Sequence, residues 1–474
     1  MKQKFFFLFM LLTCTLAEIY AQAAASFAGT WEGVLNAGVD LRIVFHIKDD
    51  GRGNLLSTAD SPDQSAFGMP CNSTTTNGTE IIISMDELKA SYTGKLINDS
   101  LIEGTFTQGA ELPLILKKVD KPSARNRPQT PGPAFPYKSE DVIYDTKDKR
   151  LQFGATITIP EGRGPFPAVL LVTGSGPQNR DGEIMGHKTF AVLADFLTRK
   201  GFIVLRTDDR GVGKSTGNFT TATSADFASD ASSGIDYLLS RPEADKKKIG
   251  LIGHSEGGMI APMVATERKE IDFIVLLAAP GVKIIDLMTE QNAAVLRSTH
   301  ISQDAIDAYL PLYRELLSRV IVETDTATAY KTAKTILDKW IAATDKKLIA
   351  ELHMQDDLAQ QNMLLTLSKQ LLTLWFKFFL HFDPQPYLQK LKCKVLAING
   401  GKDIQVIASQ NLPGIEVALK KSKSKAYTIK EFGGLNHLFQ TCKKCTVSEY
   451  GELEETFSPA ALDFIAGWMM TNTK

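Results

Sequence analysis

The sequence predicts an α/β protein with a mostly parallel sheet, helices on both faces, a helical cap insertion and a small N-terminal all-β domain. Three observations support this fold class. Residues 27–118 alternate apolar and polar side chains in short runs separated by turn residues. From Val142 onward, short apolar runs alternate with helical segments, which is typical of a parallel sheet. Between about residues 283 and 390 only helical periodicity remains.

The N-terminus is typical of an export signal. Lys2 and Lys4 precede the apolar run Phe5 to Leu12, and small residues follow. We therefore expect residues 1–23 to be a signal peptide and the mature protein to be periplasmic or secreted. The apolar run is too short to anchor the chain in a bilayer, and no other long apolar segment occurs, so no membrane span is expected.

The all-β domain is expected over residues 27–118. Leu41 to Ile47 (LRIVFHI) and Glu80 to Ser84 illustrate its alternating pattern. Residues 119–138 contain five prolines, which favour an extended and semi-rigid linker.

Residues 139–474 are expected to form the α/β domain. Its helical insertion at about 283–390 interrupts the sheet, so we expect it to overhang the carboxyl ends of the strands as a cap. The expected strands are Leu151 to Ile159, Ala168 to Val172, Phe202 to Leu205, Ile249 to Gly253, Phe273 to Leu277, Lys394 to Ile398 and Ala426 to Ile429. The expected helices in the sheet region are Thr189 to Lys200 and Ala225 to Ser240.

The segment GHSEGG, residues 253–258, follows one of these strands and precedes a helix. A G-x-S-x-G motif in that context predicts a nucleophile elbow. The glycines allow a turn so sharp that it holds the Ser255 hydroxyl above the sheet. Ser255 is therefore the candidate nucleophile.

A serine nucleophile needs a histidine base and an acid that orients it. Asp403 follows the strand Lys394 to Ile398, and His437 follows the strand Ala426 to Ile429 and a glycine-rich turn. Both therefore lie at the sheet edge where ligands bind. Among the other histidines, His187 is the competitor, because it follows a glycine-rich loop.

An acyl-transfer site also needs donors for an oxyanion. The backbone N–H of Glu256, directly after the nucleophile, is one candidate. The other is expected in the loop after the strand Ala168 to Val172, where Ser175 is preferred and Gly176 comes next. The Glu256 side chain is expected to face the pocket, and Arg180 to bind a substrate carboxylate or a neighbouring acid.

The segments GSGPQNRDG, RTDDRGVGKSTG, GHSEGG, NGGKDIQV and LNHLFQ occur in this order. Together they resemble the α/β-hydrolase superfamily, and most of all the bacterial EstD-type carboxylesterases, which carry a small β domain ahead of the hydrolase. The resemblance covers nearly all of the mature chain. It implies a triad of Ser255, Asp403 and His437, and a secreted serine hydrolase that cleaves carboxylic esters of small molecules through an acyl-enzyme. Two departures from the family pattern are Thr173, where many relatives have histidine, and the C-x-x-C segment at residues 442–445.

Net charge and motif spacing argue against several other classes of function. A formal net charge of −1 gives no electrostatic reason to expect nucleic acid or an anionic membrane as a partner. Gly211 to Thr216 ends like a phosphate-binding loop, but Asp208 stands where that motif needs its first glycine. No metal or organic cofactor is implied.

The cysteines are interpreted for an oxidising compartment. Cys442 and Cys445 are expected to form a local disulfide, because two cysteines are too few for a zinc site. Cys71 and Cys393 are expected to be buried thiols in separate domains.

Two alternatives remain open. The same triad cleaves amides, so the chain could be a serine peptidase or aminopeptidase of the prolyl-oligopeptidase-like type, with Asp356 and Asp357 as candidates for holding a peptide N-terminus. A different class of function would be an inactive hydrolase-fold binding protein, although the complete triad argues against it. The oligomeric state and the physiological substrate are not predicted.

Overall fold

The computed structural model describes residues 27–473 except 38, 39, 65, 124, 125, 133 and 425. The expected signal peptide, residues 1–23, lies outside these residues. The described chain divides into two compact units. The first runs to Asn126 and includes Ile184–Gly186, and the second comprises Arg127–Glu183 and His187 onward.

The first unit is an antiparallel sheet in the order β4-β3-β2-β1-β9-β8-β7-β6-β5. Side chains alternate between buried and exposed along most of the strands, as in β6, so one face of the sheet carries the core. This core contains Trp31, Phe45 and Tyr92, each fully buried. The strands are β1 (Gly29–Asn36), β2 (Asp40–Asp49), β3 (Leu55–Ser61), β4 (Ala66–Pro70), β5 (Ser73–Asn77), β6 (Glu80–Met85), β7 (Ala90–Asn98), β8 (Leu101–Gln108) and β9 (Ala110–Val119), with short 3-10 turns at Pro62–Gln64 and Asp86–Leu88.

The second unit is built on an eight-stranded sheet in the order β10-β11-β15-β12-β16-β17-β18-β19. β10 and β11 are antiparallel to their neighbours, and every neighbouring pair from β15 to β19 is parallel. The strands are β10 (Lys138–Asp145), β11 (Gln152–Ile159), β12 (Phe166–Val172), β15 (Ile203–Thr207), β16 (Ala244–His254), β17 (Ile271–Leu277), β18 (Lys394–Gly400) and β19 (Tyr427–Phe432), and a separate hairpin joins β13 (Glu183–Ile184) to β14 (His187–Lys188).

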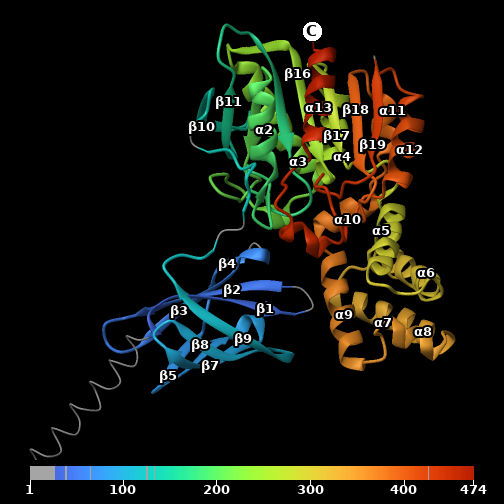
Figure 1. Cartoon of the computed structure of the whole chain (residues 1–474). Helices are drawn as coiled ribbons and strands as arrows, with labels where there is room; N and C mark the ends of the chain where they lie inside the picture. The colour runs from blue at the N-terminus through green and yellow to red at the C-terminus, as the bar shows by residue number, and fades with distance from the viewer. Residues whose placement is uncertain are drawn as a thin grey trace, which may run out of the picture. The chain divides into compact units, whose positions relative to one another are not determined.

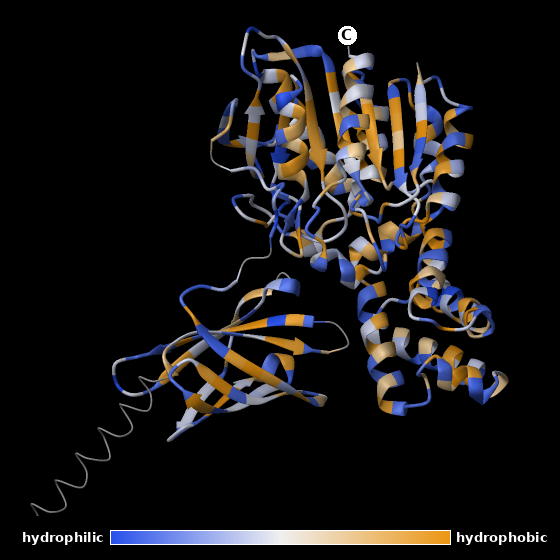
Figure 2. Ribbon diagram, in the orientation of Figure 1, coloured by the Kyte–Doolittle hydropathy of each residue, from blue (hydrophilic) through white to orange (hydrophobic). Residues whose placement is uncertain are grey.

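Helices cover both faces of this sheet (Figure 1). One face packs against α3, α4 and α12, and the other against α2 and α13. The central strands contain apolar runs, orange in Figure 2, whose side chains are buried on both faces of the sheet. These helices are α2 (Thr189–Arg199), α3 (Ser224–Ser240), α4 (Glu256–Glu267), α12 (Ala408–Leu419) and α13 (Pro459–Asn472).

The insertion between β17 and β18 is entirely helical among the described residues and begins at the carboxyl ends of the strands (Figure 1). It has its own apolar core, in which Leu316, Leu337 and Phe376 are buried. Within the Leu374 to Phe379 stripe, Leu374 is exposed and Phe376 is buried. The helices are α5 (Ile284–Ser298), α6 (Gln303–Val320), α7 (Thr326–Ala343), α8 (Lys346–Glu351), α9 (Asp357–Leu371), α10 (Leu374–His381) and α11 (Gln385–Lys390), and two 3-10 helices elsewhere in the unit are η3 (Phe219–Thr221) and η4 (Val447–Glu452).

The proline-rich segment differs from the linker expected over residues 119–138. β9 extends to Val119, and the second unit already begins at Arg127. Arg127 donates to the backbone oxygen of Gly451 at 2.8 Å, and the Gln129 side chain donates to that of Phe457 at 2.7 Å. The second half of the segment is therefore bound to the second unit by side-chain hydrogen bonds, which the proline pattern did not predict.

No single helix in the described part of the chain is both long and apolar enough to cross a membrane. Among the residues that the structure describes, the pair α9 and α10 alone satisfies that test of length and composition, and the two helices are bent by 82° at their junction.

Candidate active site

The turn that carries Ser255 joins β16 to α4. Ser255 has a φ of 55° and a ψ of −117°, a backbone conformation that L residues rarely adopt. Glycine is required on both sides. A Cβ at Gly253 would lie 2.0 Å from the Gly257 oxygen, and a Cβ at Gly257 would lie 2.2 Å from the Val172 oxygen. The glycines of the motif therefore permit the close packing that presents the serine at the edge of the sheet.

The structure brings the candidate acid and base together. Asp403 follows β18 and His437 follows β19, and Oδ2 of Asp403 lies 2.7 Å from Nδ1 of His437. Both residues are buried, with 4% and 5% of their surfaces exposed. The other Asp403 oxygen accepts hydrogen bonds from the backbone N–H groups of Gln405, at 2.8 Å, and Val406, at 2.9 Å. Because both oxygens are occupied, the carboxylate is fixed in position and aimed at the imidazole.

His254 connects the nucleophile turn to the loop of the base. Its Nε2 lies 2.9 Å from the backbone oxygen of His437, and the two imidazole rings lie 4.7 Å apart between centroids. Burial and the neighbouring His437 lower the pKa of His254 to about 3, so this imidazole is neutral and its Nε2 can donate to the carbonyl. His254 directly precedes the candidate nucleophile in the sequence, and no sequence pattern predicted this bridging contact.

The loop after β12 lies against the candidate nucleophile, Ser255. A Cβ at Gly174 would lie 3.2 Å from the Ser255 Cβ, whereas one at Gly176 would meet nothing within 4 Å. Two groups that flank the loop are fastened to Asp209: the Thr173 hydroxyl donates to it at 2.7 Å and the Gln178 N–H at 2.9 Å. The structure therefore puts Gly174, which the sequence analysis did not name as a donor, beside the serine.

We expected the side chain of Glu256 to face the pocket, but it is buried among hydrogen-bond donors instead. It is 2% exposed, and its Oε1 accepts from the Ser224 hydroxyl at 2.6 Å and from Trp375 Nε1 at 2.9 Å. Burial raises its pKa, and hydrogen bonding from Ser224, Trp375 and Ser175 acts in the opposite direction. A carboxyl group next to the nucleophile thus joins α3, the cap helix α10 and the loop after β12.

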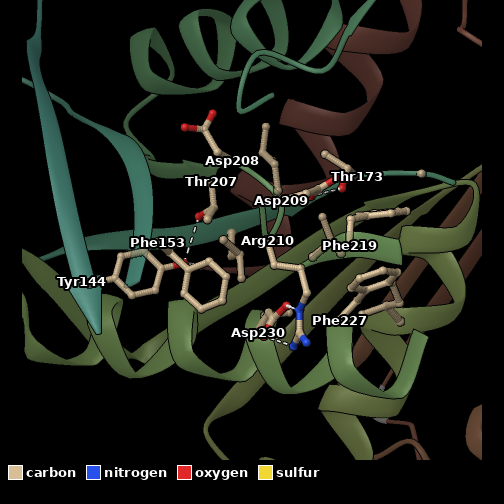
Figure 3. Close-up of a pocket in the computed structure, with 16 residues that line it drawn as sticks. Tyr144, Phe153, Thr173, Thr207, Asp208, Asp209, Arg210, Phe219, Phe227 and Asp230 are labelled. Atoms are coloured by element: carbon tan, nitrogen blue, oxygen red, sulfur yellow. Dashed lines mark hydrogen bonds and ion pairs between the residues drawn. The ribbon is translucent and has the colours of Figure 1, made fainter. Parts of the chain in front are cut away.

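A cavity of about 50 Å³ adjoins the same loop at Thr173 and Gly174 (Figure 3). Asp209 in this cavity points toward Thr173, and Arg210 points toward Asp230, to which it donates at 2.6 Å. Burial raises the pKa of Asp209 to about 7. The other residues lining the cavity are Tyr144, Phe153, Leu170, Leu171, Val172, Thr207, Asp208, Phe219, Phe227, Ala231 and Ile260.

Several other residues singled out in the sequence have structural partners. Arg180 forms an ion pair with Asp208 at 2.6 Å. Asp208 also accepts a hydrogen bond at 3.0 Å from the backbone N–H of Lys214, which belongs to the segment that ends like a phosphate-binding loop. His187, the competing base, is fully buried and lies 2.8 Å from the Thr456 hydroxyl. Asp356 caps α9 by accepting the Ala359 N–H at 2.6 Å, so helix capping explains half of the proposed amine-binding pair.

The cysteine predictions are confirmed in part. Cys442 and Cys445 form a disulfide. Cys71 and Cys393 are not disulfide-bonded and lie in separate units, but only Cys393 is buried, and Cys71 is half-buried instead of buried. Burial raises the pKa of the Cys71 thiol to about 11, so it is not a reactive thiolate at neutral pH.

The resemblance to EstD-type carboxylesterases is confirmed by a curated relative. The esterase EstD of Thermotoga maritima is 28% identical over 319 residues, which cover 66% of this chain. The chain spans 64% of the length of that relative.

Solved structures of lower sequence identity also resemble this chain. The Pyrococcus furiosus esterase Pf2001 has a TM-score of 0.42 and 16% identity, covering 74% of this chain and 98% of its own. Est1E from Butyrivibrio proteoclasticus, solved with ferulic acid, has a TM-score of 0.39 and 15% identity, covering 70% of this chain and 98% of its own.

A family model extends across more than half of the chain, from residue 150 to residue 413. It includes Ser255 and Asp403, together with the strands from β11 to β18, the cap and the loop after β12, and it ends before β19 and His437. The family is described as X-Pro dipeptidyl-peptidase. The shared segment contains the parallel strands except β19, and the turn of Ser255, and by this match the chain belongs to the peptidase S15 family of α/β-hydrolases.

Proposed function

We propose that this protein is a secreted serine hydrolase that cleaves carboxylic esters through an acyl-enzyme. The observation that carries the proposal is the buried His437–Asp403 pair, which His254 links directly to the turn of Ser255. The curated relative EstD, named as an esterase, supports the choice of ester substrates. Export rests on residues 1–23 alone.

In the proposed reaction, the Ser255 hydroxyl attacks the ester carbonyl and His437 accepts its proton. Asp403 keeps Nδ1 of His437 protonated, so that Nε2 is free to act as the base. The backbone N–H of Glu256 and an N–H of the loop at Gly174 to Gly176 stabilise the oxyanion. His437 then protonates the leaving alcohol, and water activated by the same histidine releases the acid.

The test is covalent labelling combined with turnover. A fluorophosphonate should label the wild-type protein and fail to label Ser255→Ala, and turnover of an aryl ester should fall by about 10⁶ in Ser255→Ala or His437→Ala. The double variant should be little worse, because the two residues act as a unit. Ser318→Ala is the matched control, since Ser318 is exposed on α6 of the cap. Undiminished labelling of Ser255→Ala would contradict the proposal.

The S15 family match favours a second candidate, a peptidase that releases N-terminal dipeptides. The same triad would attack an amide instead of an ester. Comparing a short-chain aryl ester with aminoacyl and X-Pro arylamides on the purified mature protein separates the two candidates. A kcat/KM that is higher for the X-Pro arylamide would assign the peptidase activity.

A further inference from the structure

A disulfide-closed turn follows the His437 loop. Cys442 and Cys445 are joined three positions apart, and the turn is followed by the 3-10 helix η4, Val447–Glu452. Neither feature takes part in the reaction proposed above. Their contacts nevertheless lead back to His437 and Asp403.

Glu449 in η4 binds the inner side of this turn. It is only 3% exposed, and its carboxylate accepts backbone N–H groups from Lys443 at 3.1 Å, Lys444 at 2.9 Å and Cys445 at 2.6 Å. Charge-assisted hydrogen bonds of this kind are stronger than neutral ones. The turn that the disulfide closes is therefore the anion-binding cradle that fixes η4.

The next residue, Tyr450, lies between the two loops of the candidate triad. It is 2% exposed, and its backbone oxygen accepts from the Gln440 side chain at 3.3 Å. Gln440 belongs to the loop of His437, which starts at Asn436, four positions earlier. Its hydroxyl accepts from the Gln405 side chain at 3.3 Å, and the Gln405 backbone N–H donates to Asp403.

The hydroxyl of Tyr450 also interacts with both members of the His437–Asp403 pair. Burial and the negative charge of Asp403 raise its pKa, while the backbone N–H of His437 acts in the opposite direction by hydrogen bonding to it. The phenol is therefore neutral and contacts the backbone N–H of His437, whereas His254 contacts the backbone oxygen of the same residue.

We propose that Tyr450 is a positioning residue that aligns His437 with Asp403, and that the Cys442–Cys445 turn holds it in place through Glu449. The proposal rests on the proposed function, because alignment matters only if His437 is the base. An external dithiol would reverse this support: it loses two hydrogens and becomes a disulfide, while Cys442 and Cys445 each gain one and become thiols. The cradle is then no longer closed by a covalent bond.

The first experiment replaces Tyr450 by Phe, which removes the hydroxyl and keeps the ring. We expect kcat for an aryl ester and the rate of fluorophosphonate labelling to fall by about 10- to 100-fold, with KM little changed, because misalignment affects the chemical step. Tyr427→Phe, on the exposed edge strand β19, is the control. An unchanged kcat in Tyr450→Phe, in a preparation where Ser255→Ala is inactive, would overturn the positioning role while leaving the proposed function intact.

The second experiment tests the disulfide on the whole protein. Treatment with a dithiol should lower kcat reversibly in the wild type, and the Cys442→Ser/Cys445→Ser variant should have the low kcat without responding to the dithiol. If the double serine variant fails to fold, Glu449→Gln replaces it as the test. This change keeps the disulfide, weakens the cradle and should also lower kcat.

The sulfur atoms and the Glu449 carboxylate lie within 4.8 Å of one another, so the reduced protein is also tested with Zn²⁺. Stoichiometric zinc binding by the reduced protein with a kcat equal to that of the oxidised protein would overturn the proposal and assign the cluster to a metal. A kcat that is insensitive to reduction, with both thiols confirmed by alkylation, would also overturn it.

Discussion

Nε2 of His254 lies 2.9 Å from the backbone oxygen of His437, so the residue before the nucleophile holds the loop of the base. Because Ser255 is the next residue, a shift of this hydrogen bond would change the distance between nucleophile and base. His254→Phe keeps a ring against His437 and removes the donor. We expect kcat to fall by about 10-fold, somewhat more than the typical value of one hydrogen bond, because alignment is lost with it. Equal kcat values for His254→Phe and the wild type would contradict the bridging role.

Asp403→Asn should fold and lose about 10⁴ in kcat. One Asp403 oxygen accepts two backbone N–H groups and the other faces His437, so an Asn must keep its oxygen toward the backbone and turn its NH₂ group to Nδ1. That arrangement stabilises the wrong tautomer of the imidazole. Asp338→Asn, at an exposed ion pair in α7, is the control for steady-state kinetics on an aryl ester. Near-normal turnover of Asp403→Asn would mean that another carboxylate supports the histidine.

Trp375→Phe tests whether Glu256 fastens the cap to the nucleophile turn. The change removes the indole N–H that donates to Glu256 at 2.9 Å and keeps an aromatic ring beside Phe379. We expect KM to rise by up to about 10-fold, corresponding to one hydrogen bond to a buried acid, with a smaller change in kcat. The effect should be non-additive with Glu256→Gln. Trp340→Phe is the matched control, because Trp340 donates to Ala308 inside the cap; an equal rise in KM there would remove the special role of Glu256.

The residues that the sequence predicted share one property. Ser255, Asp403 and His437 each stand in a short motif directly after a strand, and in a parallel sheet such positions meet at one edge. Local pattern was therefore enough to choose them. The strands and helices expected in the sheet region begin and end within five residues of the observed ones, but β10 was not expected as a strand.

The contacts that the sequence did not reveal join residues far apart in the chain. His254 meets His437 across 183 positions and Trp375 meets Glu256 across 119. Such pairs depend on how the cap and the loops pack, which no periodicity records. The position of Gly174 against Ser255 was missed for the same reason, since Ser175 and then Gly176 were preferred as donors from the sequence, which does not show which residue of the loop packs against the serine.

Asp209 makes stability depend on pH near neutrality. Its pKa is raised from 3.8 to about 7 by burial, so the folded state keeps a proton that the unfolded state loses above 3.8. The resulting stabilisation is full below pH 3.8 and is lost as the pH rises toward 7. Asp209→Asn removes this titration, and its amide can still bind Thr173 and Gln178 after rotation of the threonine hydroxyl. Urea unfolding at pH 5 and pH 8 should show a smaller loss of stability for Asp209→Asn than for the wild type. Equal losses would mean that Asp209 is ionised in the folded protein across this range.

Truncation before and after Arg127 tests where the second unit begins. A chain that starts at Asn126 keeps the hydrogen bonds of Arg127 to Gly451 and of Gln129 to Thr456 and Phe457, whereas one that starts at Phe135 loses them. We expect the longer chain to retain turnover of small esters, because the candidate triad and the loop after β12 all belong to the second unit. The shorter chain should unfold at a temperature several degrees lower, since each lost hydrogen bond contributes about 1 kcal/mol. Thermal unfolding and aryl ester hydrolysis measure both effects. A chain from Asn126 that folds with a normal melting temperature and has no activity would show that the N-terminal β unit contributes to the active site.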